Sequence, residues 1–368
     1  MGQANDDNDL LGFVRDLADP ATFTVEEDLG HGYVRLRVTE AERRQALQDI
    51  RSVEDVVKEL VRNARDAGAR HILVSFQKEK GRWRNICVLD DGGGIPPELH
   101  HKIFEARVTS KVREVVTDHL GIHGRGMALY SIKQVVGEVH LVGSEVGRGT
   151  AIRARIDTRD VPERKDQSTF PRLEANEEGV LEVVGGPHNV PRVLTEFVLQ
   201  DDEVELYLGS NAEILSTLYH LSSDLRKSWA GGGRLEGRPL WFELGGIKEG
   251  KALRNFAWER LGLAVSERNA FRVLECEIPP LMSINELLRS GAEDPGLRRS
   301  DLHRPIRVEW SDQLARRLTP QDLKLLSSRL SEVFQEIGER CWLAAEHPVI
   351  KRRKDRLIIS LRLHEKED

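Results

Sequence analysis

The sequence predicts an α+β fold in which helices cover an antiparallel sheet. Apolar residues recur every three or four positions across residues 39–69, which predicts a helix with one buried face. Two strand-like stretches follow, residues 71–76 and 85–89, joined by the polar turn KEKGRWR. Two more, residues 138–143 and 150–156, are joined by the glycine-containing turn SEVGRG. Helices and antiparallel strands in this order are typical of a two-layer sandwich with its helices on one face.

The first helix has an internal break signal. Ser52 is followed three residues later by Asp55, and this pairing is typical of a helix N-terminus. We therefore expect a second helix to begin after Ser52. Farther along, residues 96–104 begin a further helix, a polar stretch runs to Leu120, and a glycine cluster opens an apolar helix over residues 127–136.

The second half of the chain follows a polar stretch without any period, which predicts a linker or a mobile connection. Beyond it a long helix is expected to begin at Thr319, with Pro320 in its first turn. The other expected elements are strands at residues 192–199, 239–244 and 271–278 and a helix at residues 211–230. We predict four parts: an N-terminal segment (1–45), a first domain (46–158), a linker (159–180) and a second α/β domain (181–368).

Composition excludes several classes of protein. The 368 residues carry 55 basic and 61 acidic side chains, so the net charge of -6 does not mark the whole surface as a nucleic-acid binder. Three separated cysteines, Cys87, Cys276 and Cys341, argue against a disulfide framework and indicate a reducing compartment. The start, MGQANDDNDL, lacks the pattern of a secretion signal, and no apolar run is long enough to span a membrane. We expect a cytoplasmic protein without membrane contact.

The first chemical motif lies on the helix that follows Ser52. Glu59 and Asn63 are four residues apart and project from the same helix face, with Asp66 three residues further on. A carboxylate at this place can take a proton from an attacking water, and an amide oxygen is a ligand that Mg²⁺ accepts alongside phosphate oxygens. By itself, this spacing is also that of an ordinary solvated helix face.

The second motif, VLDDGGGIPPE, follows a predicted strand and places Asp90, Gly92 and Gly94 in a tight turn. Glycines allow the backbone to come close to a ligand, and Asp90 can accept a hydrogen bond from an adenine amino group. A plain glycine turn between two elements is the alternative interpretation.

The third motif, GIHGRGMALYSI, contains Gly121, Gly124 and Gly126 directly before a helix. Free backbone N–H groups at a helix N-terminus favour a phosphate. The motif is neither the dinucleotide fingerprint nor a P-loop, because no strand leads directly into it and no Gly-Lys-Ser/Thr follows. Thr150, after the turn glycines of the last hairpin, can bond to adenine or to a bound water.

In this order, Glu59 with Asn63, Asp90-x-Gly92-x-Gly94, the glycine loop and Gly149 with Thr150 resemble the motifs of the GHKL ATPases. The superfamily includes gyrase-type and type IIB topoisomerase B subunits, MutL proteins, heat-shock chaperones and histidine kinases. The resemblance implies a Bergerat α/β sandwich that binds ATP and Mg²⁺, with Glu59 catalytic, Asn63 on the metal, and a lid at about residues 97–120. The remaining nucleotide-binding residues that it implies are Asp66, Asp90, Gly92, Gly94, Lys111, Gly121, Gly124, Gly126 and Thr150.

The branch of the superfamily is left open by the motifs. VVKELVRNARDAGA resembles MutL and topoisomerase VI B subunits, and Lys111 lies in a Thr-Ser-Lys that resembles the MutL lid, where it contacts phosphate or is simply exposed. KIFEARVTSK and the run after Gly124 also resemble histidine kinases, although the only histidine upstream of Glu59, His31, lies in a predicted turn and strand.

Our leading hypothesis is an ATP-gated homodimer that resembles a type IIB topoisomerase B subunit, with the second domain like its transducer domain. The implied partners are a separate DNA-cleaving subunit and DNA, for which KRRKDR at residues 351–356 is either a contact or an exposed basic turn. The alternatives are a histidine-kinase-like signalling ATPase and an ATP-binding scaffold without hydrolysis.

Overall fold

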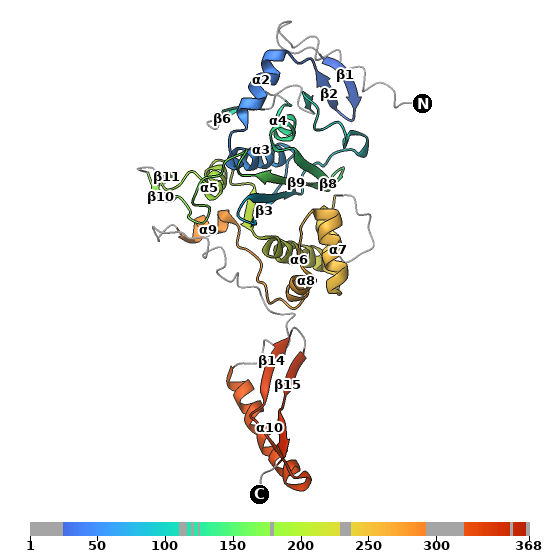
Figure 1. Ribbon diagram of the computed structural model, residues 1–368, viewed down its shortest axis with the longest axis vertical. Coiled ribbons are helices and arrows are strands. Elements are labelled where there is room, and N and C mark those ends of the chain that lie inside the picture. The colour runs from blue at the N-terminus through green and yellow to red at the C-terminus, as the bar shows by residue number, and fades with distance from the viewer. Residues whose placement is uncertain are drawn as a thin grey trace.

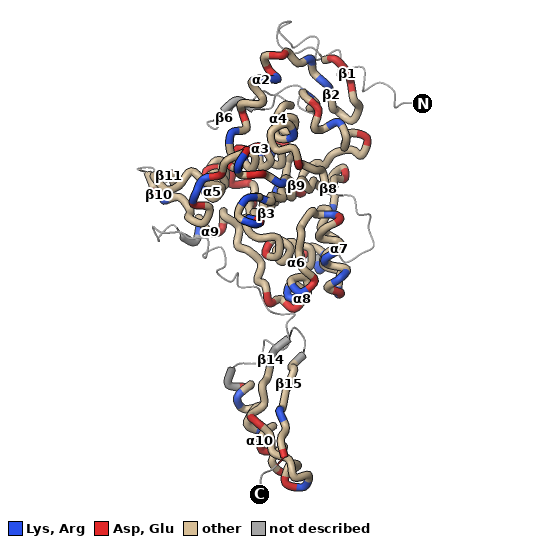
Figure 2. The backbone as a smooth tube through the Cα atoms, viewed as in Figure 1, with Lys and Arg blue, Asp and Glu red and all other residues tan. Residues whose placement is uncertain are grey.

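A computed structural model gives the structure of the protein. It describes residues 25–109, 116–118, 121–123, 126–176, 180–228, 237–291, 320–353 and 356–365. Within these residues, no helix combines the length and the apolar character that a membrane crossing requires. Lys and Arg residues are interspersed with Asp and Glu residues along the described chain, so neither sign dominates a large region (Figure 2).

The long helices and the paired strands of the first half appear in the predicted order (Figure 1). The elements of this half are β1 (Val25–Gly30), β2 (Tyr33–Leu36), α2 (Glu40–Asp49), α3 (Val53–Asp66), β3 (His71–Glu79), β4 (Trp83–Asp90), η1 (Pro97–Leu99), β5 (Val108–Thr109), β6 (Val116–Asp118), β7 (Gly121–His123), α4 (Ala128–Val136), β8 (Glu138–Glu145) and β9 (Gly149–Asp157). The helix expected over residues 96–104 is only the short 3-10 helix η1, and β1, β5, β6 and β7 were not predicted.

The break in the first helix lies where the sequence predicts it. The Ser52 side chain accepts a hydrogen bond from the Asp55 backbone, and the Asp55 side chain accepts one from the Ser52 backbone. This reciprocal capping box satisfies backbone donors that would otherwise lack partners at the start of α3. It separates α3 from α2, which has its own capping box at Thr39. The α+β class is therefore confirmed, down to the start of the helix that carries the first motif.

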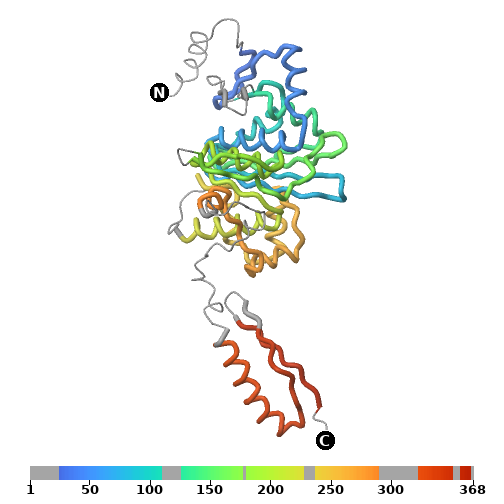
Figure 3. The backbone as a smooth tube through the Cα atoms, turned by 90° about the vertical axis from the view of Figure 1, so that its left-hand side faces the viewer, coloured from blue at the N-terminus to red at the C-terminus, as the bar shows by residue number. Residues whose placement is uncertain are grey.

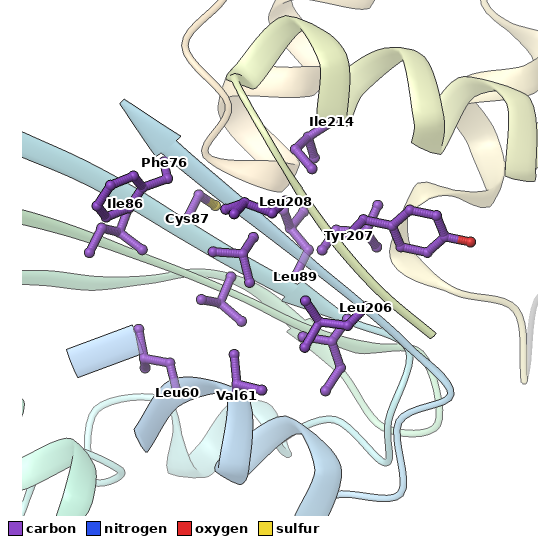
Figure 4. Close-up of a cluster of buried hydrophobic side chains, with 14 of the residues drawn as sticks. Leu60, Val61, Phe76, Ile86, Cys87, Leu89, Leu206, Tyr207, Leu208 and Ile214 are labelled. Carbon is purple, nitrogen blue, oxygen red and sulfur yellow. The ribbon is translucent and has the colours of Figure 1, made fainter. Parts of the chain in front are cut away.

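A five-stranded sheet in the order β12-β3-β4-β9-β8 forms the centre of the molecule. The β3, β4, β9 and β8 neighbours pair antiparallel, and in this register Asp90 lies opposite Thr150. Leu60 and Val61 of α3 pack against one face of the sheet (Figure 4). Residues that are far apart in the sequence, at the ends of β4 and β9, thus become neighbours beside α3.

The second half contributes to the same sheet. Its elements are β10 (Arg172–Ala175), β11 (Leu181–Gly185), α5 (Val190–Gln200), β12 (Glu205–Gly209), α6 (Asn211–Ser228), η2 (Leu240–Gly246), α7 (Gly250–Leu261), α8 (Glu267–Leu274) and α9 (Ile284–Gly291). Strand β12 runs parallel to β3, with Leu206 opposite Ile72. Ile214 of α6 lies on the sheet face opposite α3 (Figure 4).

This arrangement differs from the expected division after a linker at residues 159–180. Buried side chains from α3, β3, β12, α6 and α7 form one continuous hydrophobic core. The thiol of Cys87 on β4 donates to the Leu261 carbonyl oxygen at the end of α7, at 3.0 Å. Helices therefore cover both faces of the sheet, and residues 181–291 pack as part of the body that contains the first motifs.

Three predicted strands of the second half are wrong. Residues 192–199 lie in helix α5, residues 239–244 lie mostly in the 3-10 helix η2, and residues 271–278 lie mostly in helix α8 and the turn after it. In α5 the buried residues Val190, Leu194, Phe197 and Val198 follow a helical period. The β-branched and aromatic residues had suggested strands, but their spacing fits helices. The helices predicted at residues 211–230 and after Thr319 are confirmed as α6 and α10 (Pro320–Cys341).

Residues 320–365 form a small unit of their own. Helix α10 packs on β13 (Leu343–Ala345) and β14 (Val349–Arg353), and the strands pair as β13 with β16 (Leu363–Glu365) and β14 with β15 (Arg356–Ser360). Figure 3 shows α10 lying beside the paired strands, apart from the central sheet. No aliphatic or aromatic side chain whose burial is described in this unit belongs to the buried core.

Candidate functional site

A cavity of about 920 Å³ lies between α2, α3, the end of β4 and the start of α4. Its volume is in the range of small-molecule and cofactor sites. The predicted site residues that line it are Glu59, Asn63, Asp66, Asp90, Gly94, Gly126 and Thr150. Four stretches of the chain that are separated in the sequence thus contribute to one cavity, as the motifs together predict.

Helix α3 supplies the carboxylate and the amide of the first motif. Glu59 is partly exposed to the cavity and accepts a hydrogen bond from Arg62 Nη1 at 2.9 Å, one helical turn away. The Nδ2 atom of Asn63 is buried and makes no hydrogen bond to the described residues. An unsatisfied buried amide is costly unless a ligand or water completes it. The inner face of α3 is therefore suited to a polar ligand in the cavity.

Asp90 stands at the end of β4 and is only 6% exposed. Its Oδ1 accepts the Gly92 backbone N–H at 2.9 Å. Burial raises the pKa of the Asp90 carboxyl to about 7, and the neighbouring Asp91 also raises this pKa, while hydrogen bonds from the Gly92 and Thr150 backbones oppose the change. A buried carboxyl of this kind is suited to a specific hydrogen bond with a ligand donor, because solvent does not compete for it.

Hydroxyl groups continue the wall beside Asp90. Ser144 Oγ accepts the Ile95 backbone N–H at 2.7 Å and donates to the Gly149 carbonyl oxygen at 3.0 Å. Thr150 Oγ1 lies 3.1 Å from Ser144 Oγ, and both residues are buried. Ser144 thereby fixes the Asp90 turn to the last hairpin, a role that the sequence motifs do not assign to it.

The glycines of the Asp90 turn are required by the protein's own backbone. A Cβ on Gly92 would lie 2.8 Å from the Ala67 carbonyl oxygen, and a Cβ on Gly94 would lie 2.0 Å from that of Glu145. Gly94 also has a positive φ of 68°. We had expected these glycines to permit close approach of a ligand. The described contacts show that they let the turn pack against α3 and the β8–β9 turn, and their role toward a ligand stays a prediction.

Replacing Gly94 by alanine is expected to destabilise the protein by more than about 3 kcal/mol, since a backbone clash adds to the unfavourable φ. Gly147 is the matched control, because its φ is 71° and a Cβ there would meet nothing within 4 Å. Gly147→Ala is expected to cost only about 1 kcal/mol. Urea denaturation of both variants measures the difference, and equal losses would contradict this packing role.

The third motif, residues 121–132, is described only in part. Lys111 and Gly124 lie outside the described residues. Gly121 begins strand β7, and Gly126 precedes α4 with a φ of 65° and accepts the Arg107 backbone N–H at 2.9 Å. Gly126 reaches the cavity as expected, and the N-terminus of α4 lies beside it.

The first part of the predicted lid packs firmly. Leu99 and Ile103 are buried, and β5 pairs with β2 in a three-stranded sheet with β1. Arg107 forms an ion pair with Glu42 of α2, and both side chains line the cavity. The expected lid spans about residues 97–120, and buried apolar side chains along residues 99–108 pack its first part against the neighbouring elements.

The N-terminal elements form a wall of the cavity that the sequence motifs did not predict. Tyr33 of β2 and Glu42 of α2 line it. Arg35 joins β2 to both Glu27 and Glu105 by ion pairs. Acidic and basic residues alternate before Glu59, and this alternation was the sequence signal for these elements. The partners of these charged residues lie too far away in the chain to be identified from spacing.

Asp91 supports the site from behind. Its Oδ1 accepts the backbone N–H groups of Arg70 and His71 at 2.8 Å each, and its Oδ2 lies 2.7 Å from His71 Nδ1. The hydrogen bonds from His71 and Arg70 hold the Asp91 pKa below its usual value, against the effect of burial. The adjacent carboxyls therefore have different roles. Asp90 lines the cavity, and Asp91 fixes the start of β3.

Comparisons with known proteins agree with this geometry. The family described as histidine kinase-, DNA gyrase B- and HSP90-like ATPase matches residues 48–160. DNA mismatch repair protein MutL of Chelativorans sp. (strain BNC1) is 46% identical over 80 residues, which are 22% of this chain and 13% of that protein. MutL of Thermus aquaticus is 42% identical over 84 residues, 23% of this chain and 15% of that protein. The chain therefore spans well under a fifth of the length of these relatives.

Solved structures give weaker likenesses. The Aquifex aeolicus MutL ATPase domain complexed with ADP has a TM-score of 0.26 and 25% identity, covering 44% of this chain and 60% of that chain. The mycobacterial sensor histidine kinase MprB has a TM-score of 0.22 and 21% identity, covering 34% of this chain and 75% of that chain. These TM-scores carry no argument, so the assignment rests on the sequence match: residues 48–160 match the GHKL ATPase family and are similar in sequence to MutL.

Proposed function

We propose that the protein binds ATP with Mg²⁺, hydrolyses it, and uses the nucleotide to open and close a homodimer in DNA transactions. The observation that supports this most strongly is the shared cavity, in which the residues of separate GHKL motifs meet. The relatives identified above are mismatch-repair proteins, so the proposal follows the MutL branch in preference to the topoisomerase VI branch.

The chemistry of the cavity residues suits a magnesium nucleotide. The Asp90 carboxylate would accept a hydrogen bond from the adenine amino group, with Thr150 beside it. Asn63, whose buried Nδ2 makes no hydrogen bond to the described residues, would offer its amide oxygen to Mg²⁺. Among the described residues, no three His, Cys, Asp or Glu side chains gather into a metal-binding cluster. Mg²⁺ would neutralise charge on the phosphates.

Glu59 is the proposed general base. Its carboxylate would take a proton from the water that attacks the terminal phosphate, and Arg62 would hold the carboxylate in place through the 2.9 Å hydrogen bond. The phosphates would lie toward Gly126 and the N-terminus of α4, where backbone N–H groups favour negative charge. Gly121, Gly124 and Lys111 are proposed to complete this phosphate site, with Asp66 and the Gly92–Gly94 turn supporting the nucleotide.

The nucleotide would act on the assembly through the N-terminal wall. Because Tyr33 and Glu42 line the same cavity, a bound nucleotide that contacts this wall would favour one position of β1, β2 and α2 over another. We propose that this closed position pairs the N-terminal segments of two copies, and that hydrolysis releases them. DNA and a separate DNA-cleaving protein are the proposed partners of the closed state.

Cross-linking tests whether nucleotide controls the contact between the N-terminal segments of two copies. Glu26 is exposed on β1, and Glu26→Cys in a Cys341→Ser background places a reactive thiol there while Cys87 and Cys276 stay buried. A short thiol cross-linker is expected to join two copies when Mg²⁺ and a non-hydrolysable ATP analogue are present, and much less with ADP or no nucleotide. Equal cross-linking with and without the ATP analogue would contradict nucleotide control of this contact.

Labelled ATP provides the second measurement. Release of inorganic phosphate without label on protein is the expected result. Stable transfer of the terminal phosphoryl group to a protein would contradict the switch and favour a signalling kinase, and tight binding without turnover would favour a scaffold.

A further inference from the structure

Arg107 lies where three parts of the cavity wall meet. Its backbone N–H donates to the Gly126 carbonyl oxygen at 2.9 Å, and its carbonyl oxygen accepts the Leu36 backbone N–H at 3.1 Å. Its side chain forms an ion pair with Glu42 of α2, and both of these side chains line the cavity. Arg107 therefore joins the third motif, strand β2 and helix α2.

The backbone of Arg107 has an unfavourable conformation. Its φ is 59°, in the left-handed region that residues with a Cβ rarely adopt. Such a conformation persists only where the surroundings fix it, and it is common at ligand-binding and switch positions. Gly126 packs closely here, since a Cβ on it would lie 3.2 Å from the Arg107 Cα. The fixed backbone holds the Arg107 side chain in the cavity wall, where only 4% of it is exposed.

The charge of Arg107 needs an anion beside it at this depth. A buried guanidinium is costly unless an anion pairs with it, and here the Glu42 carboxylate is an anion in contact. Glu42 is the less buried partner, with 33% of its side chain exposed. Its other oxygen accepts the Thr39 backbone N–H at 2.9 Å and completes the capping box of α2. Glu42 would therefore remain solvated and hydrogen-bonded if Arg107 left it.

A nucleotide phosphate is suited to replace Glu42 as the anion on Arg107. The proposed position of the phosphates is beside Gly126, the residue to which the Arg107 backbone is bonded. A guanidinium matches the oxygens of phosphate as well as those of a carboxylate, and a triphosphate carries more negative charge. Arg62, a cavity arginine that is equally buried, is paired with Glu59 on α3 instead.

We propose that Arg107 exchanges partners when nucleotide binds, leaving Glu42 for a phosphate of the nucleotide. This inference rests on the proposed ATP function and adds the contact through which the N-terminal wall responds to nucleotide. In the free protein the Arg107–Glu42 pair holds α2 in place and competes with the phosphates. In the bound protein α2 keeps its capping box and loses the ion pair. Because α2 also packs on α4, its release changes the wall beside the phosphates.

Glu42→Gln tests the exchange. Gln keeps the capping box through its amide oxygen, but it carries no charge to pair with Arg107. Calorimetry with Mg²⁺ and a non-hydrolysable ATP analogue is expected to show an affinity about ten-fold higher than wild type, because phosphate no longer competes with a carboxylate. Affinity for adenosine, which has no phosphate, should not change. Glu40→Gln is the control, since Glu40 is exposed in the same helical turn and does not line the cavity. It should bind the analogue like the wild type.

Two further variants separate the exchange of partners from a general effect of charge. Asp49 of α2 also lines the cavity, but it accepts a hydrogen bond from Gln45. Asp49→Asn should change affinity for the analogue by less than about three-fold, as for an ordinary exposed charge. In an Arg107→Gln background, Glu42→Gln should give no larger gain than Asp49→Asn. This double variant contains neither charge of the pair, so it leaves no buried ion without a partner.

The proposal would be overturned by an unchanged analogue affinity in Glu42→Gln, by an equal gain for adenosine, or by a gain that persists without Arg107. If Glu42→Gln does not fold, Glu42→Asp provides the same test, since its shorter side chain withdraws the carboxylate from Arg107. Absence of a gain there would also overturn the exchange. A wild-type protein that binds no ATP analogue would contradict the proposed ATP function itself. Normal wild-type binding without these gains would contradict only the exchange.

Discussion

Asp90→Asn is expected to abolish ATP binding while making the folded protein more stable at pH 8. The Asn amide can accept the Gly92 N–H through its oxygen, as Asp90 does. Its NH₂ group then faces the cavity, where the proposed ligand group is the adenine amino donor, so two donors oppose each other. We expect affinity to fall at least about a hundred-fold, measured by calorimetry with a non-hydrolysable analogue.

The stability change follows from the raised pKa of Asp90, about 7 against an ordinary value of 3.8. Between these values the folded protein holds a proton that the unfolded chain has lost, so stability falls as the pH rises through this window. Above pH 7 the folded protein carries a buried, poorly solvated charge. The neutral Asn avoids this cost, which the difference between the two pKa values puts at about 4 kcal/mol at pH 8. Its advantage should shrink as the pH falls below 7 and vanish near pH 4.

Denaturation at pH 8 and pH 4, with exposed Asp202→Asn as the control, measures the effect. Asp202→Asn should be neutral at both values. A loss of stability in Asp90→Asn at pH 8 would show that the fold favours the carboxylate form of Asp90, and it would contradict the burial cost on which this prediction depends.

Glu59→Gln is expected to reduce ATP turnover by about 10²–10⁴-fold while leaving ATP affinity within a few-fold of wild type. Gln cannot take a proton from water, but its carbonyl oxygen can still accept the hydrogen bond from Arg62, so the buried guanidinium keeps this contact. This makes Gln a cleaner replacement than Ala, which would also remove a partner of Arg62.

The matched control is Glu138→Gln, whose side chain is 52% exposed on β8 and does not line the cavity. It should hydrolyse ATP like the wild type. Wild-type turnover in Glu59→Gln would assign the base elsewhere, whereas loss of affinity together with turnover would give Glu59 a role in binding.

Local signals in the sequence were sufficient for the first half of the fold. The capping box at Ser52 and the helical period after it predicted α3, and the strands predicted there end within three residues of the observed ones. These features depend on neighbours within a few residues. For the same reason Glu59, Asn63 and Asp90 could be selected as site residues before their meeting point was known.

The coverage of both sheet faces was harder to predict, although the sequence contains a sign of it. Residues 72–76 of β3 are buried without interruption, and they read ILVSF, not an alternation of apolar and polar residues. A continuous apolar run is typical of a strand buried on both faces. Helix α6 lies on the second face, and β12 pairs with β3 within the sheet. Both elements are more than a hundred residues away from β3 in the sequence, so their placement depends on long-range packing.

The site residues that the sequence motifs missed act through partners distant in the chain. Arg107 pairs with Glu42, Ser144 contacts Ile95 and Gly149, and Asp91 fixes the backbone of Arg70 and His71. Spacing along one helix or turn cannot identify such pairs. A family motif marks the groups nearest the ligand better than it marks the groups that hold them in place.

Separate segments of the chain are proposed to bind one magnesium nucleotide in the described cavity, and every functional step depends on this binding. Hydrogen exchange of the backbone amides with and without Mg²⁺ and a non-hydrolysable ATP analogue tests it most directly. We expect nucleotide to slow exchange at the same time in the second half of α3, in the turn after Asp90 and at the start of α4. Unchanged exchange in these segments, or protection confined to one of them, would contradict a shared nucleotide site.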